Sequence, residues 1–99
     1  MASTTIFEGI VFVEGDHPGA MRGGTVESDL TYSFGAQLKS LNDIERNLAR
    51  QAEKKGFNAI LDFEHGQESR SFAFDSVGLW GKGVLANIPR GDYERLRTS

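Results

Sequence analysis

The chain opens with a dense apolar segment that predicts a β-strand. Residues 5–13 are rich in β-branched and aromatic side chains, and a turn-prone Glu-Gly-Asp run follows at 14–16. Successive side chains of a strand point to opposite faces, so both faces of this strand carry large apolar groups and need cover. The alternation gives one set of Ile6, Ile10 and Phe12, and a second set of Phe7, Val11 and Val13.

The next two segments have weaker patterns. Residues 15–24 carry four glycines and one proline without hydrophobic periodicity, which predicts a long loop. Residues 25–34 have apolar positions at Val26, Leu30, Tyr32 and Phe34. This spacing fits either a short strand after Asp29 or irregular packing beneath the sheet.

An amphipathic helix of about four turns is predicted after Ser40, which is a good N-cap. Gly56 supplies its C-terminal stop. Apolar residues recur at helical spacing and form one stripe: Leu41, Ile44, Leu48 and Ala52. The other faces take the charged residues Glu45, Arg46, Arg50, Glu53 and Lys54.

The C-terminal half predicts three more strands. Residues 58–64 read as a strand with Ala59, Leu61 and Phe63 on one face and Ile60, Asp62 and Glu64 on the other. A polar turn at 65–70 precedes a strand at 71–75, and a hairpin turn across 75–78 leads into a strand at 79–88. Residues 92–99 are predicted as a charged tail, either flexible or with a helical turn around Tyr93 and Leu96.

These elements predict a single α+β domain spanning residues 1–99, with a mostly antiparallel sheet in the order β-loop-α-β-β-β. One helix covers only one face of the sheet, and burying even four large side chains on the other face would favour association by several kcal/mol. We therefore expect a homo-oligomer, unless residues 15–34 fold back over the second face and leave a monomer. The candidate interface residues are Phe7, Ile10, Val11, Phe12, Val13 and Trp80.

Composition narrows the classes of function. The chain has 99 residues, no cysteine and a net charge of -3. The lack of cysteine excludes a disulfide framework and a thiolate site and fits a reducing compartment. Residues 1–5 lack the basic start and apolar stretch of a signal peptide, so we expect a cytoplasmic protein. The acidic balance argues against nucleic-acid binding, and no apolar run is long enough to span a membrane.

Residues 48–61, where an Ala-rich helix end and a Gly stop lead into a buried strand, and the closing Gly-Lys-Gly-Val at 81–84 resemble the YbjQ-like family. That family comprises small bacterial proteins described as heavy-metal-binding. The resemblance covers about residues 48–86 and implies an α+β fold that assembles into a ring, typically a pentamer. It carries over no functional residue, because the family's motif before the helix has no counterpart in residues 35–43.

One candidate metal site lies in the glycine-bearing loop, where Glu14, Asp16 and His17 supply two carboxylates and an imidazole to a divalent cation. The alternative is a solvated acidic turn in which Pro18 restricts His17. No serine sits in a catalytic frame beside His and an acid, so we expect no enzyme and no cofactor. The sequence thus favours a non-enzymatic homo-oligomer whose function resides in the assembled surface; the alternative is a module that binds a divalent metal or small ligand at residues 14–24 or between subunits.

Overall fold

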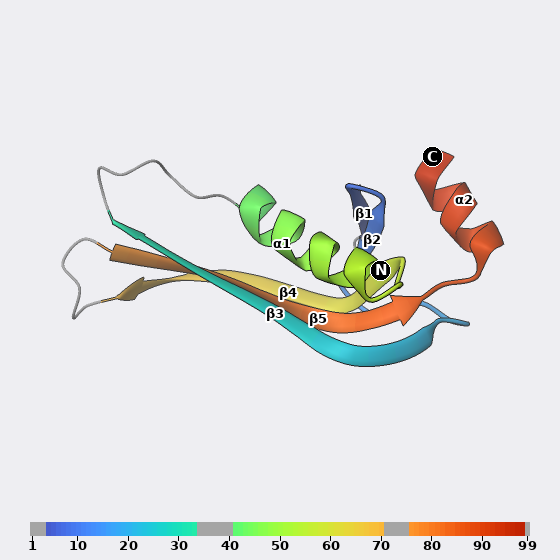
Figure 1. The fold of residues 1–99 in the computed structure, drawn as a ribbon, viewed down its shortest axis with the longest axis horizontal. Helices are drawn as coiled ribbons and strands as arrows, with labels where there is room; N and C mark the ends of the chain where they lie inside the picture. The colour runs from blue at the N-terminus through green and yellow to red at the C-terminus, as the bar shows by residue number, and fades with distance from the viewer. Residues whose placement is uncertain (1–3, 34–40, 71–75, 99) are drawn as a thin grey trace.

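A computed structural model describes residues 4–33, 41–70 and 76–98. They form one five-stranded mixed sheet and two helices, which confirms the α+β fold and the single domain (Figure 1). The elements, in chain order, are β1 (Thr4–Phe7), β2 (Ile10–Val13), β3 (Met21–Ser33), α1 (Leu41–Lys54), β4 (Ala59–Arg70), β5 (Ser76–Asn87) and α2 (Arg90–Thr98).

The apolar segment at 5–13 is a hairpin and not one strand. Glu8 and Gly9 have φ values of 49° and 82°, the left-handed pair that a two-residue type I′ turn requires. The turn folds β1 back on β2, so that Phe7 faces Ile10 and Ile6 faces Val11. The predicted faces of Ile6 and Phe7 were therefore exchanged, because the period of two was carried through the turn.

The strand order is β1-β2-β4-β5-β3. β2 and β4 are parallel, and the chain between them passes through β3 and α1; the other neighbours pair antiparallel. The predicted loop at 15–24 is shorter than expected, because β3 begins at Met21 and continues through the ambiguous segment to Ser33. A register shift between Arg22 and Thr25 absorbs the Gly23-Gly24 pair within β3.

Helix α1 confirms the predicted amphipathic element and packs on one face of the sheet. Ile44, Leu48 and Ala52 are fully buried against strand residues that include Phe12 and Ile60. Leu41, predicted in the same stripe, is 37% exposed. The assignment of Glu45 to an outer face was wrong: its residue is only 9% exposed, because it lies one helical turn from Leu41 and Leu48 on the side that meets the sheet.

Helix α2 covers the opposite face, so the segment predicted as a charged tail is an ordered helix. Tyr93 and Leu96 pack against the second core cluster, which consists of Val11, Val13, Ala59, Leu61, Ala86 and Ile88. In Figure 1, the β1–β2 hairpin lies between the two helices. The sequence did not predict this helix, because its buried side carries only two apolar residues, Tyr93 and Leu96. Among the described residues, neither helix has the length and apolar character to cross a bilayer.

Strands β4 and β5 are longer than predicted. The expected polar turn at 65–70 is the second half of β4, which pairs with β5 as far as Arg70 and Ser76. The predicted turn at 75–78 was therefore misplaced, and the predicted strand at 71–75 lies outside the described residues. A bulge at Asp62, whose φ is 51°, shifts the register and places Phe63 on the same side as Ile60, contrary to the simple alternation.

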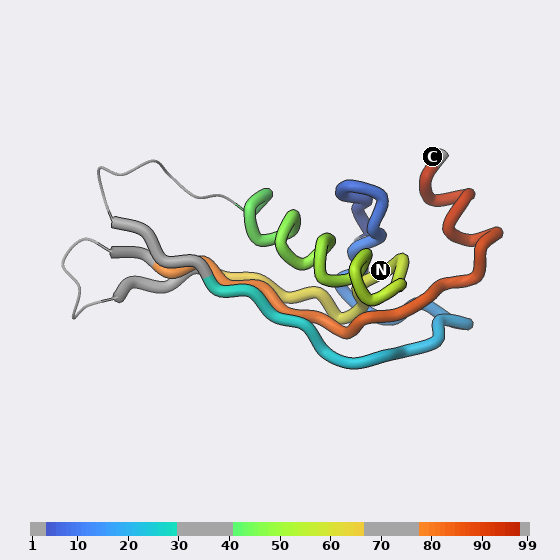
Figure 2. The backbone as a smooth tube through the Cα atoms, viewed as in Figure 1, coloured from blue at the N-terminus to red at the C-terminus, as the bar shows by residue number. Residues whose placement is uncertain are grey.

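Three strands run past the helix. β3, β4 and β5 stay paired as far as Ser33, Arg70 and Ser76, and Figure 1 shows them extending beyond the N-terminal end of α1. Figure 2 traces the course of α1 along the central part of these strands. We call this three-stranded extension the arm. The molecule is elongated as a result, with principal extents of 48 × 28 × 24 Å.

Candidate functional site

β3 is a long strand at one edge of the sheet, and its end belongs to the arm. β5 pairs with one side of it from Met21 to Ser33. On the other side, the carbonyl oxygen of Glu27 accepts a hydrogen bond of 3.2 Å from the side-chain amide of Gln51 in α1. Backbone groups of alternate residues point to the same edge, so Asp29 and Thr31 share this outer side. No described strand pairs with it.

The outer part of β3 lacks the usual protection of an edge strand. Natural edges are blunted by lysine, proline, bulges or a short length, because their free N–H and C=O groups offer a template for another chain. Residues 25–33 contain no lysine, arginine or proline, and the bulge of β3 lies before this stretch. Gln51 occupies the carbonyl of Glu27. No described strand pairs with the outer edge of β3, so this edge is available to a sixth strand from another chain.

A second edge is open on β4. β2 pairs with β4 only at Ala59 and Ile60, and the N–H of Asp62 then donates to the carbonyl of Gly15 over 2.8 Å. β4 continues for eight more residues, to Arg70, without a described strand on that side. Both margins of the arm thus carry backbone groups that can pair.

The face of the sheet opposite α1 carries charged side chains and the single tryptophan. Lys82 lies 3.3 Å from Glu64 in the directly opposite register position, and both side chains are more than half exposed. The ring of Trp80 lies over Gly66, where a Cβ would approach it to 2.7 Å, so the glycine makes room for the indole. A shallow cavity of about 470 Å³ lies beside these residues and is also lined by Glu27 and Asp62.

An arginine ties the loop after β2 to this face. Arg22 donates to Asp16 over 2.8 Å and to Asp62 over 2.9 Å. The hydrogen bond from Arg22 is the main reason that the pKa of Asp16 lies below its ordinary value. Because all three side chains are largely exposed, each pair contributes little to stability by itself, and the effect is to orient the loop.

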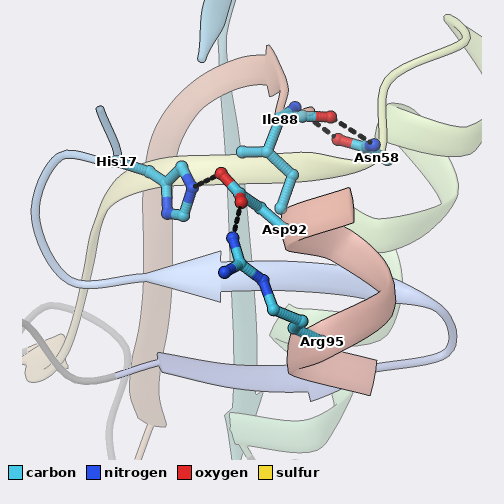
Figure 3. Close-up of polar contacts among 5 residues, drawn as sticks. All are labelled: His17, Asn58, Ile88, Asp92 and Arg95. Atoms are coloured by element: carbon cyan, nitrogen blue, oxygen red, sulfur yellow. Dashed lines mark hydrogen bonds and ion pairs between the residues drawn. The ribbon is translucent and has the colours of Figure 1, made fainter. Parts of the chain in front are cut away.

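A second polar network holds α2 in place (Figure 3). His17 Nε2 lies 2.9 Å from Asp92 Oδ2, and Arg95 contacts the other oxygen of the same carboxylate. The contact with His17 is the largest cause that lowers the pKa of Asp92, and Arg95 adds to it. Nearby, the Asn58 side chain accepts from the Ile88 N–H over 2.9 Å and donates to its carbonyl over 3.2 Å, which fixes the chain as it leaves β5.

The structure does not bring the three candidate metal ligands together. Asp16 is bound to Arg22, and His17 is bound to Asp92. Glu14 lines a different cavity, on the α1 side of the sheet. Within the described ranges, no group of three or more His, Cys, Asp or Glu side chains has the spacing of a metal site.

The candidate interface residues of the first strands are buried by the chain itself. Ile10, Val11, Phe12 and Val13 are each at most 5% exposed, because α1 covers one face of β2 and α2 the other. Phe7 and Trp80 are half-buried. The argument for association from an uncovered β2 face therefore loses its basis, and the open surface lies on the arm.

Three functional candidates were missed from the sequence. Asp92 lies 75 positions from His17, so no local pattern joins them. Arg22 lies in a segment that was taken as a loop. Glu45 had a signal, since it falls between two buried positions of the helix, but a carboxylate is rarely found fully buried.

No protein-family model, curated protein or solved structure matches this chain. The resemblance to the YbjQ-like family stays a prediction.

Proposed function

We propose that this chain is a non-enzymatic, cytoplasmic domain that assembles with copies of itself, and that its function resides in the assembled surface. The observation that carries the proposal is the outer edge of β3. It is long, it lies at the end of the sheet, and residues 25–33 contain none of the residues that normally prevent edge pairing.

Charge favours pairing between unlike edges. If β3 paired with β3 of a second copy, the acidic residues Glu27 and Asp29 of both chains would come close together, and like charges in neighbouring strands are destabilising. The open part of β4 contains acidic residues and also the basic residues His65 and Arg70. We therefore propose that β3 of one copy pairs with β4 of the next.

Pairing between two different edges is head-to-tail, and it produces a closed ring when the rotation between neighbours closes. A ring of this kind agrees with the resemblance to the YbjQ-like family, from which we propose a pentamer. Each copy would use one β3 edge and one β4 edge, so a closed ring leaves neither of these edges unpaired.

The proposal is tested by the mass of the protein in solution. Sedimentation velocity and native mass spectrometry of the full chain at micromolar concentration should give a multiple of 10.9 kDa. Thr31→Pro removes one outward N–H of the β3 edge without touching the ladder with β5, and it should shift the protein towards the monomer. Thr31→Ala keeps the N–H and is the matched control, which should assemble like the wild type.

Two results would contradict the proposal. A wild-type mass of 10.9 kDa at micromolar concentration would exclude stable assembly. An oligomer that survives Thr31→Pro with its mass unchanged would place the interface elsewhere. Circular dichroism of the variant is needed in both cases, to show that it is folded.

A further inference from the structure

A separate cavity lies on the α1 side of the sheet, on the face opposite Lys82 and Trp80. Its volume is about 140 Å³, and it lies between the first turns of α1, the end of β2 and the middle of β4. Phe12 and Phe63 are buried and form its apolar part. Glu14 and His65 are exposed and lie at its rim. The cavity therefore has an apolar interior and an ionisable entrance.

Glu45 is the unusual residue in this cavity. It is only 9% exposed, and within the described residues no hydrogen bond holds its carboxylate. Burial raises its pKa above the ordinary value, and the nearby His65 opposes this shift only in part. A buried carboxylate whose charge is offset only in part is costly, so its presence against a cavity fits a further compensating group.

A cation is the compensating group that fits the donors present. Glu45 and Glu14 approach the cavity from different elements, so a cation between them would interact with two carboxylates. A metal ion needs three or more ligands at fixed short distances, and the described part of the chain holds no such cluster. An ammonium group accepts looser geometry, because each of its N–H donors needs one acceptor only.

The aromatic residues favour an organic cation over a bare ion. The rings of Phe12 and Phe63 meet edge to face, with centroids 5.0 Å apart. Such a wall contacts a short alkyl chain, and a ring face attracts a desolvated cation. Since one water occupies about 30 Å³ of the liquid, this cavity suits a molecule of roughly four to five heavy atoms. We infer that the cavity binds a small primary alkylammonium ion through Glu45, with Glu14 at the entrance.

The test uses propylammonium chloride as the probe, added to the full-length protein at constant ionic strength. Two-dimensional ¹H–¹⁵N NMR should show a saturable shift of the amides that surround the cavity, including those of Glu45, Phe63 and His65. Glu45→Gln keeps the size of the side chain and removes its charge, so it should weaken binding at least tenfold. Glu53→Gln, on the exposed side of the same helix, is the matched control and should bind like the wild type.

Neutral and inorganic probes decide the ligand class. 1-Propanol, which has the same chain length without the charge, should bind at least tenfold more weakly than propylammonium. Equal binding of the two, retention of binding in Glu45→Gln, or a saturable response to zinc or magnesium in place of the amine would overturn the inference. So would the absence of any saturable shift. Thr31→Pro should bind the probe normally, because this cavity lies within one chain, so the failure of assembly and the failure of binding can be told apart.

Discussion

Leu48→Ala tests whether the packing of α1 on the sheet holds the fold together. Leu48 is fully buried, and its Cδ1 lies 3.4 Å from the position that a Cβ on Gly81 would occupy. The substitution removes three carbon groups, which costs about 2.4 kcal/mol at ~0.8 kcal/mol for each. Gly81 has no side chain that could move into the space, so the cavity should stay open and raise the loss to about 3–4 kcal/mol, within the usual range for Leu→Ala.

The loss should be measured by urea unfolding, followed through the fluorescence of Trp80, the single tryptophan, and through circular dichroism. All variants should be compared at one protein concentration, because assembly makes stability depend on concentration. In thermal unfolding, a domain of this size loses roughly 4–8 °C of Tm for each kcal/mol, so the Tm of Leu48→Ala should fall by more than 10 °C. Arg50→Ala, on the exposed side of α1, should change stability by less than about 0.5 kcal/mol. Losses of equal size in Leu48→Ala and Arg50→Ala would refute the assigned packing face.

Three further substitutions, the first with a matched control, probe other parts of the structure. Gly83→Ala should cost about 1–3 kcal/mol in urea unfolding, because its new Cβ would collide with Ile60, whereas Gly24→Ala meets nothing within 4 Å and should be nearly neutral. Because the pKa of Asp92 is lowered in the folded protein, its ionised form stabilises the fold above the ordinary carboxyl pKa, and this stability is lost as the pH falls through the folded-state pKa. Asp92→Asn should therefore lower the free energy of unfolding at neutral pH. It should also make that free energy depend less on pH below about pH 4. Glu45 has the opposite sign: its raised pKa makes the ionised form costly above the ordinary carboxyl range, so Glu45→Gln should stabilise the ligand-free protein at pH 7 and lose this advantage below about pH 4 in thermal unfolding.

The helix α1 was predictable because its signal is local. Ser40, the apolar spacing from Ile44 to Ala52 and the stop at Gly56 all lie within a few turns. The first strands were harder, since Glu8-Gly9 interrupts an apolar run that otherwise alternates as one strand. Glu8 must adopt a positive φ there, which no propensity for glutamate predicts.

The candidate sites depended on contacts that the sequence does not encode locally. The pairing of His17 with Asp92 follows from the docking of α2, and the burial of Glu45 follows from the position of β4 beneath α1. The prediction that one sheet face at residues 5–13 stays uncovered was wrong. β2 is covered on both faces, while the arm, whose strand lengths were underestimated, carries the exposed edges.

The parallel contact between β2 and β4 has a consequence for the order of folding. β4 and β5 are joined by a short connection, so their hairpin closes a small loop and can form early. β2 meets β4 only at Val11 with Ala59 and Phe12 with Ile60, about fifty residues apart along the chain. Closing a loop of that length costs roughly 3 kcal/mol in chain entropy before any contact forms. The β1–β2 hairpin should therefore dock last and open first, and its amides should exchange with solvent deuterium faster than those in the centre of β5.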